Sequence, residues 1–225
     1  VRQVYTGSVP RLKRIACMAS HAYNGGKEMG VPMPKNERRY TYADYRNWPE
    51  DERWELIEGE AFAMGAPSWT HQELVAILTV ELRLFLKGKP CRPFVSPVDV
   101  FLPAPGQTVA DIDTVVQPDL GVVCDRSRII PRGVFGAPDL VMEILSPSSV
   151  LHDLNRKKDL YARAGVREYW VWSQALDWVT IQHLTAEGIW DEGESFGPEQ
   201  SARSQVLAGL GISLADIRAE LIRPE

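Results

Sequence analysis

The sequence predicts a domain of the α/β class, in which a sheet of buried strands is combined with helices. Apolar residues recur at helical spacing after Thr70, and several valine- and leucine-rich runs are typical of strands. The run from 140 to 145 is almost continuously apolar. The chain has 225 residues, of which 44% are hydrophobic and 24% charged, so it can bury a sizeable core.

The first part of the chain differs from the rest. Residues 1–38 are punctuated by glycine and proline and lack a sustained apolar period, which predicts a weakly ordered extension before a single domain at 39–225. No run approaches the roughly 18 apolar residues of a membrane span, and no apolar leader segment is evident. We therefore expect a cytoplasmic protein without a membrane partner.

The predicted domain begins with a hairpin and a helix. The apolar runs 54–57 and 61–64 flank Glu58-Gly59, a pair typical of a tight turn. Thr70 and Glu73 fit a capping box for the helix that follows. That helix shows its apolar spacing at Leu74, Leu78, Leu82 and Phe85 and is expected to end at Lys87-Gly88.

Strands and a second helix complete the expected order. Extended segments are predicted at 94–102, 115–123 and 140–145. Ser148 or Ser149 can cap a helix that runs to Ala164 and stops at Gly165. Strands at 168–172 and 178–184 follow, and we expect their tryptophans, Trp170, Trp172 and Trp178, to fill the core or a subunit interface.

One acidic residue, Glu143, lies at the middle of the apolar run 140–145. Such a run is typical of a strand that is covered on both faces. An unpaired buried carboxylate is costly, so Glu143 must be protonated, paired with a cation or bound to a metal ion. We favour a metal-binding or catalytic role over a structural ion pair.

A second acidic candidate, Asp119, follows a proline inside the valine-rich run 115–123. Proline removes a backbone donor from a sheet, so it suits an edge or a bulge and lets Asp119 turn toward a cleft. An aspartate that satisfies nearby backbone donors explains the pattern equally well. Asp139, in a second Pro-Asp pair, is the rival for the same role.

Lys157 is the anomalous cation of the second predicted helix. At roughly 100° per residue it lies at the centre of the apolar stripe, whereas the neighbouring charged residues point away. A salt bridge to Asp153 is the structural alternative, but it contributes only about 0.3 to 0.5 kcal/mol if exposed. We therefore favour a functional lysine.

Three side chains are weaker candidates. His71 falls on the inward side of the first helix, where a lone histidine is more often a satisfied core residue than a catalytic one. Glu55 and Glu60 lie on the hairpin and are explained mostly as exposed strand residues, although either can join a carboxylate cluster.

Composition and motifs argue against several function classes. Three cysteines without a CxxC spacing disfavour a zinc site and a disulfide framework. The formal charge of −5 disfavours coating of nucleic acid through bulk charge, although a local basic groove remains compatible. No HExxH, P-loop or GxGxxG spacing occurs. Two carboxylates also suit a glycosidase, but the inward lysine counts against that class.

Several of these segments, taken in order, resemble the Uma-two family of bacterial endonucleases. The resemblance covers about Tyr40 to Leu221. It rests on WELIEGE at 54–60, HQ at 71–72, SPVDV at 96–100, QPDL at 117–120, APDLVMEILSPS at 137–148 and YARAGVREYW at 161–170.

That family is assigned to the PD-(D/E)xK nuclease superfamily, so the resemblance implies a restriction-endonuclease-like mixed sheet with flanking helices and metal-dependent phosphodiester hydrolysis. Asp119 matches the aspartate of the Pro-Asp motif, and Glu143 matches the acidic residue of the next motif. The usual lysine would stand two residues later, where this chain has Leu145. Lys157, on the helix that follows, is the natural substitute.

The combined interpretation is an endonuclease whose Mg²⁺ or Mn²⁺ ion is held by Asp119 and Glu143. Lys157 would orient or help to deprotonate the attacking water, and His71 and Glu60 would contribute secondarily. The expected partner is nucleic acid, with DNA favoured, and a homodimer is compatible with the sequence. The alternative is a catalytically silent module that binds nucleic acid or protein.

The absence of an apolar period in the N-terminal segment generates a first prediction. Deletion of residues 1–32 should barely change the melting temperature, because this segment contributes no predicted core face. Thermal unfolding of the full and shortened chains measures the effect. A large drop would mean that the segment packs on the domain or on a partner subunit.

Overall fold

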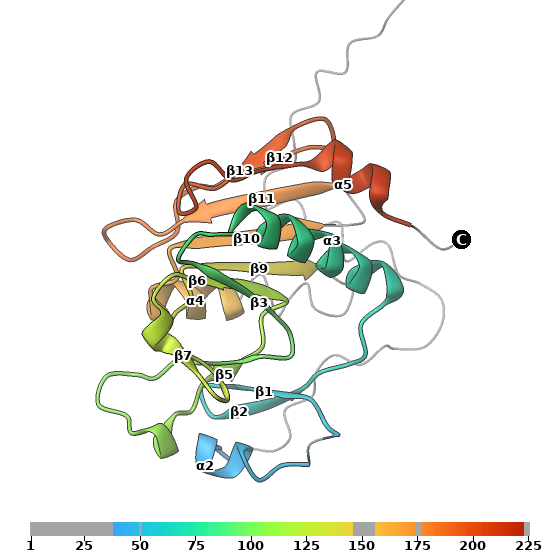
Figure 1. Cartoon of the computed structure of the whole chain (residues 1–225). Helices are drawn as coiled ribbons and strands as arrows, with labels where there is room; N and C mark the ends of the chain where they lie inside the picture. The colour runs from blue at the N-terminus through green and yellow to red at the C-terminus, as the bar shows by residue number, and fades with distance from the viewer. Residues whose placement is uncertain (1–37, 50, 146–155, 174–176, 223–225) are drawn as a thin grey trace, which may run out of the picture.

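The computed structural model describes residues 38–49, 51–145, 156–173 and 177–222 (Figure 1). The predicted N-terminal extension therefore lies outside the described residues except for Arg38, and so does the predicted start of the second helix at Ser148 or Ser149. Within the described part, two six-stranded sheets and a two-stranded ribbon are combined with a few helices. The predicted α/β class is confirmed.

The two large sheets are called sheet I and sheet II. In spatial order, sheet I contains β2 (Glu60–Ala63), β1 (Trp54–Ile57), β5 (Val115–Val116), β4 (Asp99–Phe101), β8 (Gly133–Phe135) and β7 (Ile129–Ile130). Sheet II contains β12 (Glu194–Phe196), β11 (Trp178–His183), β10 (Glu168–Ser173), β9 (Leu140–Leu145), β6 (Leu120–Val123) and β3 (Arg92–Val95). Both sheets are mixed, because β4 and β8 pair in parallel, as do β9 and β10, while the other neighbours are antiparallel.

The remaining elements are short apart from one helix. They are α2 (Tyr42–Tyr45), α3 (Trp69–Phe85), α4 (Lys158–Ala164), α5 (Leu214–Glu220), the 3₁₀ turns Val109–Asp111 and Arg126–Arg128, and a ribbon of β13 (Ser201–Arg203) and β14 (Gly211–Ser213). The long helix α3 covers one face of sheet II (Figure 1). The hairpin of β1 and β2 lies at the other end of the molecule, beside α2.

Two predicted strands are corrected by the structure, because each divides between the two sheets. The segment 94–102 leaves sheet II after β3 and enters sheet I as β4, and the segment 115–123 leaves sheet I after β5 and enters sheet II as β6. Pro97 and Pro118 lie at these crossings, where they supply no backbone donor to a ladder. The Ser96 amide donates to the Asp119 carbonyl at 3.1 Å, so the crossings lie side by side.

The predicted hairpin is confirmed, and the predicted start of α3 is wrong. Glu58 and Gly59 both have positive φ, 50° and 80°, as a tight hairpin turn requires. The N-cap of α3 is Ser68, whose side chain accepts the His71 amide at 3.2 Å. Thr70 is already inside the helix, and the Glu73 carboxylate accepts instead from the indole of Trp69 at 2.9 Å.

The two faces of sheet II carry separate apolar clusters. Leu74, Leu78 and Leu82 of α3 share one cluster with Met142 and Trp170 of the sheet. A second cluster joins the opposite face of the sheet to α4, through Val141, Tyr169, Val171, Leu160 and Tyr161. The three tryptophans predicted as core residues are buried. Strand β9 is buried along its whole length, so Glu143 lies in the interior.

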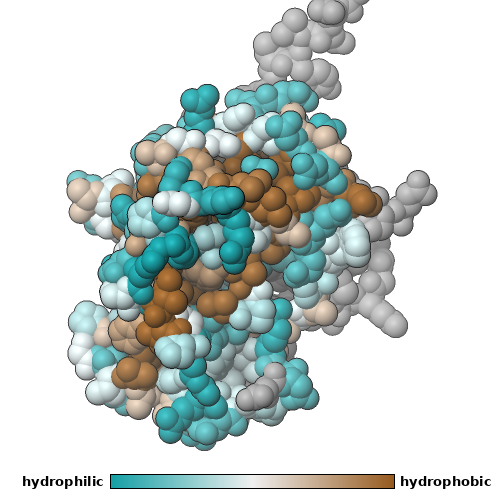
Figure 2. Space-filling view, viewed as in Figure 1, coloured by the Kyte–Doolittle hydropathy of each residue, from teal (hydrophilic) through white to brown (hydrophobic). Residues whose placement is uncertain are grey.

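The edges of the two sheets open onto an apolar cleft of about 400 Å³ between β3 and β7. Its lining includes Phe94, Val98, Val123, Ile129 and Val134. In the view of Figure 2, hydrophobic residues are interleaved with hydrophilic ones on the face that carries α3. Among the described residues, no helix is both long enough and apolar enough to span a membrane.

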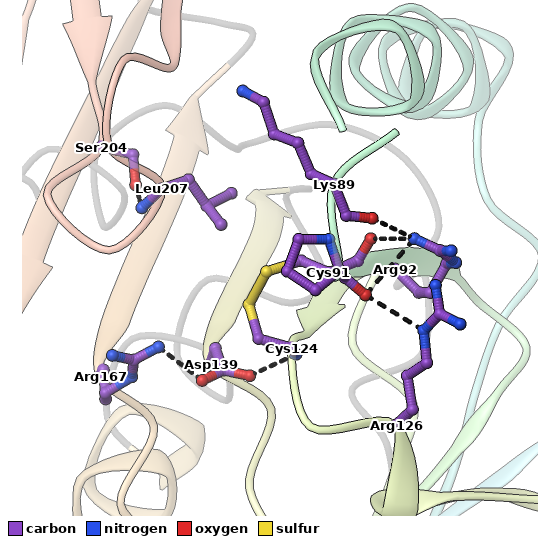
Figure 3. Close-up of a disulfide and its surroundings, with 10 residues drawn as sticks. Lys89, Cys91, Arg92, Cys124, Arg126, Asp139, Arg167, Ser204 and Leu207 are labelled. Atoms are coloured by element: carbon purple, nitrogen blue, oxygen red, sulfur yellow. Dashed lines mark hydrogen bonds and ion pairs between the residues drawn. A yellow bond between two sulfur atoms is a disulfide. The ribbon is translucent and has the colours of Figure 1, made fainter. Parts of the chain in front are cut away.

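A disulfide between Cys91 and Cys124 is present, although the sequence analysis disfavoured a disulfide framework (Figure 3). The two residues directly extend the paired strands β3 and β6, because Arg92 is opposite Val123 in that ladder. Their separation of 33 residues in the sequence gives no sign of this proximity. The strand pairing creates it.

The disulfide generates a stability prediction. Reduction, or Cys91→Ser, should lower the free energy of unfolding by about 2 to 4 kcal/mol, because the bond closes a long loop in the unfolded chain. Urea unfolding with and without dithiothreitol measures the change. Cys17→Ser is the matched control, and an equal loss in that variant would contradict the prediction.

Candidate active site

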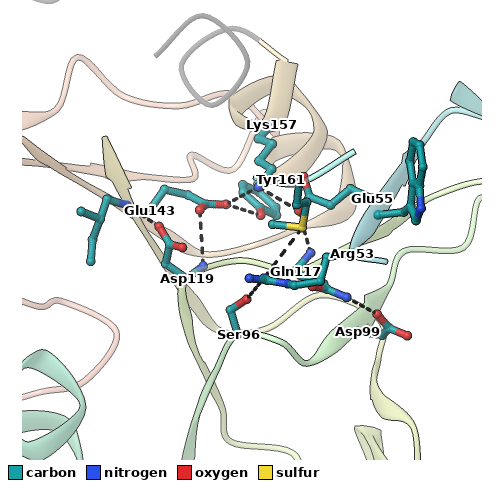
Figure 4. Close-up of polar contacts among 12 residues, drawn as sticks. Arg53, Glu55, Ser96, Asp99, Gln117, Asp119, Glu143, Lys157 and Tyr161 are labelled. Carbon is teal, nitrogen blue, oxygen red and sulfur yellow. Dashed lines mark hydrogen bonds and ion pairs between the residues drawn. The ribbon is translucent and has the colours of Figure 1, made fainter. Parts of the chain in front are cut away.

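A buried lysine between two carboxylates forms the centre of the candidate site (Figure 4). The Lys157 Nζ atom lies 2.9 Å from Glu55 Oε1 and 3.2 Å from Glu143 Oε1. The exposed fractions of these side chains are 4%, 3% and 3%. All three are sheltered from solvent screening, so their mutual attraction is much stronger than that of surface ion pairs.

Each member of this centre comes from a different part of the fold. Glu55 belongs to β1 of sheet I, Glu143 to β9 of sheet II, and Lys157 to the N-cap position of α4. The predicted inward position of Lys157 is confirmed by its 3% residue exposure. Its predicted alternative partner, Asp153, lies outside the described residues.

Tyr161 completes the buried centre from one turn further along α4. Its hydroxyl donates to Glu143 Oε1 at 2.7 Å, which fixes the orientation of the carboxylate. Burial raises the pKa of Tyr161 well above 10, and the negative charges of Glu143 and Glu55 raise it further. Tyr161 is therefore a neutral hydrogen-bond donor throughout the physiological pH range.

Asp119 lies directly beside Glu143. The Ile144 amide donates to Asp119 Oδ2 at 2.8 Å, and the Asp119 amide approaches Glu143 Oε2 at 3.4 Å. The two residues extend the antiparallel pair formed by Leu120 and Met142, which explains their proximity. Asp119 Oδ1 accepts no hydrogen bond from any described residue, and the side chain is 17% exposed. This oxygen is available to a ligand.

His71 reaches the same carboxylate from the first turn of α3. Its Nε2 atom lies 3.1 Å from Asp119 Oδ2, and its side chain is 12% exposed. Because a carboxylate oxygen accepts, Nε2 is the protonated nitrogen in this contact. The Nδ1 atom is buried and has no partner within the described part of the chain. The predicted inward direction of His71 is confirmed.

Two acidic candidates lie outside the centre. Glu60 is one-third exposed and pairs with Arg156 at 2.6 Å, so Glu55 is the hairpin carboxylate at the site. Asp139, the rival of Asp119, accepts the Cys124 amide at 2.6 Å and pairs with Arg167 at 2.5 Å. These bonds give Asp139 a structural role.

The site offers oxygen ligands of the kind that hard divalent ions prefer. Asp119 Oδ1 accepts no hydrogen bond within the described ranges, and Glu143 Oε2 faces Asp119, while the other Glu143 oxygen is held by Lys157 and Tyr161. No group of three or more His, Cys, Asp or Glu side chains forms a metal-binding cluster in the described ranges. Two carboxylates, completed by water and substrate oxygens, nevertheless fit Mg²⁺ or Mn²⁺.

The fold is similar to that of a solved structure from Anabaena variabilis, described as "a putative nuclease belonging to DUF820". That structure is 21% identical in sequence, has a TM-score of 0.67 and covers 81% of this chain and 99% of its own. An uncharacterized protein of Synechocystis is 26% identical over 163 residues, which are 71% of this chain and 80% of that protein. The structural similarity shows that this chain shares the mixed α/β fold of the Anabaena protein.

The family itself is identified by a sequence profile. The profile of Uma2, described as "Putative restriction endonuclease", matches residues 42–215. This chain belongs to the Uma2 family. The resemblance found in the ordered motifs is thereby confirmed, and the family supports a nuclease.

The raised pKa of Tyr161 generates a prediction about alkaline stability. An unfolded tyrosine loses its proton near pH 10, whereas folded Tyr161 retains it to higher pH, so stability is complete below pH 10 and falls as the pH rises further. Each such tyrosine should contribute about 1.4 kcal/mol of loss per pH unit. Burial also raises the pKa of Tyr45, which adds to the loss. Tyr161→Phe should flatten the decline.

Urea unfolding between pH 8 and pH 11 tests this expectation. Tyr40→Phe is the control, since the Tyr40 hydroxyl makes no hydrogen bond to a described residue. An unchanged alkaline slope in Tyr161→Phe would contradict the assignment of this pKa to Tyr161.

Proposed function

We propose that this protein is a metal-dependent endonuclease that hydrolyses phosphodiester bonds, with DNA as its substrate. One observation carries the proposal: Asp119 and Glu143 lie side by side at the crossing of the two sheets, with a buried lysine on the far oxygen of Glu143. Carboxylates and a lysine in contact provide the groups that this chemistry requires.

Asp119 Oδ1 and Glu143 Oε2 would hold the ion. A bound Mg²⁺ or Mn²⁺ supplies charge neutralisation at the phosphate and a lowered pKa of the attacking water. The protein fixes both carboxylates beforehand, through the Ile144 amide on Asp119 and the Tyr161 hydroxyl on Glu143. This preorganisation favours the site because little rearrangement is needed at the moment of reaction.

Lys157 takes the role of the lysine that the superfamily motif would place at position 145. Its ammonium group, already held by Glu55 and Glu143, would orient the water and offset the negative charge that develops on the phosphate. Glu55 is then a positioning residue for Lys157. It also accepts the Gln117 amide at 2.7 Å, which fixes the carboxylate against the crossing strand.

His71 and Glu60 would act secondarily. His71 holds Asp119 Oδ2, which leaves Oδ1 directed to the ion. Glu60 would contribute only through Arg156, whose guanidinium also packs over Phe62 at 4.7 Å. Of these two residues, His71 has the stronger geometric support.

A catalytically silent binding module is the second candidate function. Two observations favour it: the net charge is −5, and Lys157 is engaged by two carboxylates instead of facing solvent. Under this alternative the buried centre is a structural ion cluster that joins the sheets. The two functions differ in whether cleavage depends on the metal and on Lys157.

A cleavage assay distinguishes them. The protein should nick supercoiled plasmid DNA in Mg²⁺ or Mn²⁺ and not in EDTA, and Asp119→Asn and Lys157→Ala should each lower the rate by about 10² to 10⁴-fold. Lys158→Ala and Asp139→Asn are the matched controls and should retain most of the activity below their melting temperatures. An RNA of the same sequence tests the substrate preference.

The alternative function is supported if the parent protein never cleaves, or if Lys157→Ala cleaves like the parent. Circular dichroism must accompany the Lys157→Ala assay, because removal of the cation leaves two buried carboxylates without their partner. Asp119→Asn keeps the test decisive if Lys157→Ala does not fold.

A further inference from the structure

Arg53 is a half-buried guanidinium next to the candidate site that has only neutral partners. Its Nη2 atom lies 2.6 Å from Ser96 Oγ, 3.2 Å from Gln117 Oε1 and 3.9 Å from Met64 Sδ. Its Nε atom is buried without an acceptor among the described residues, and its Nη1 atom, which is not buried, also makes no hydrogen bond there.

The other cations near the site each pair with a carboxylate, which Arg53 does not do among the described residues. Lys157 pairs with Glu55 and Glu143, Arg156 with Glu60 and Arg163 with Glu58. Arg53 contacts no carboxylate in the part of the chain that the structure describes. A cation that is partly withdrawn from water normally has an anionic partner, so this guanidinium is suited to an anion that arrives from solution.

Both anchors of Arg53 belong to the crossings that form the site (Figure 4). Ser96 donates its amide to the Asp119 carbonyl at 3.1 Å, and Gln117 donates its amide to Glu55 at 2.7 Å. Ser96 therefore links Arg53 to Asp119, the proposed metal ligand, and Gln117 links Arg53 to Glu55, the partner of Lys157.

The orientation of Arg53 is fixed by the side-chain amide of Gln117. Gln117 Nε2 donates to Asp99 Oδ1 at 3.0 Å and approaches the Tyr45 hydroxyl at 3.3 Å. These donor contacts leave Gln117 Oε1 directed at Arg53. The guanidinium is therefore held in place before any ligand binds, which lowers the entropic cost of using it.

We propose that Arg53 is a phosphate-binding residue, which contacts the nucleic-acid backbone at a phosphate beside the scissile bond. The inference rests on the proposed nuclease function and adds to it the cation that positions the strand. Guanidinium N–H groups match phosphate oxygens in geometry and charge, and Nη1, which is not buried, is the donor left for that contact. The contact is to the backbone, so it carries no base preference.

The test is equilibrium binding without turnover. A fluorescein-labelled duplex DNA is titrated with the full chain in EDTA and in Ca²⁺, and the anisotropy is followed from 50 to 200 mM NaCl. Arg53→Met should weaken binding by about 10- to 100-fold, as expected for loss of a charged hydrogen-bonded contact. It should also reduce the slope of log affinity against log salt by about 0.9.

The matched control is Arg46→Met, which removes the same charge from an exposed arginine next to α2. Its affinity and salt slope should stay near those of the parent. Arg53→Lys keeps the charge but not the planar fork, so it should bind more tightly than Arg53→Met and more weakly than the parent. This variant preserves the test if Arg53→Met does not fold.

The outcomes separate the two proposals. A parent that binds DNA through Arg53 but never cleaves overturns the nuclease function and supports the phosphate contact. A parent that cleaves while Arg53→Met binds with unchanged affinity and slope overturns the phosphate contact alone. Equal losses in Arg46→Met and Arg53→Met, or a parent that does not bind DNA at all, also overturn it.

Discussion

The buried ion pair of Lys157 with Glu55 and Glu143 is the interaction on which the arrangement of the site depends. Its members come from sheet I, sheet II and the start of α4, so satisfying one ammonium group requires all three elements to be in place. Buried charges tolerate the loss of a partner poorly, because the remaining charge has neither water nor a counterion. The pair therefore specifies how the sheets meet, whatever its net contribution to stability.

The second constraint is the double crossing between the sheets. Two adjacent chain segments leave one sheet and enter the other, and each does so at a proline. Backbone groups that no longer belong to a ladder must find other partners. Several do so within the site: the Gln117 amide donates to the Glu55 carboxylate and the Asp119 amide approaches the Glu143 carboxylate, while the Ser96 amide donates to the Asp119 backbone carbonyl. The crossing thus supplies backbone donors that fix the two glutamate carboxylates. The same hydrogen bonds satisfy the backbone and position the side chains of the site.

In this member of the Uma2 family, the cation beside Glu143 comes from α4 and not from strand β9. A lysine two residues after Glu143 would have to share the strand, whereas Leu145 contributes to the apolar cluster on the α4 side of sheet II. Lys157 approaches Glu143 from the helix instead, and Tyr161 one turn later secures the same carboxylate oxygen. Under the proposed function, a cation delivered from a separate element can serve phosphodiester hydrolysis equally well, because such a reaction depends on where charges lie and not on their order in the chain.

The sequence by itself determined the elements with strong local signals and the anomalous residues within them. The hairpin turn at Glu58-Gly59, the apolar period of α3, the buried strand of Glu143 and the inward positions of His71 and Lys157 all follow from patterns a few residues long. The features that depend on strand pairing were decided only by the tertiary structure. It divided two apparent strands between two sheets, joined Cys91 to Cys124, and brought Glu55 rather than Glu60 to Lys157. Hydrophobic pattern reports whether a strand is covered, but strand order and register decide which side chains meet, and these are set by contacts between residues far apart in the chain.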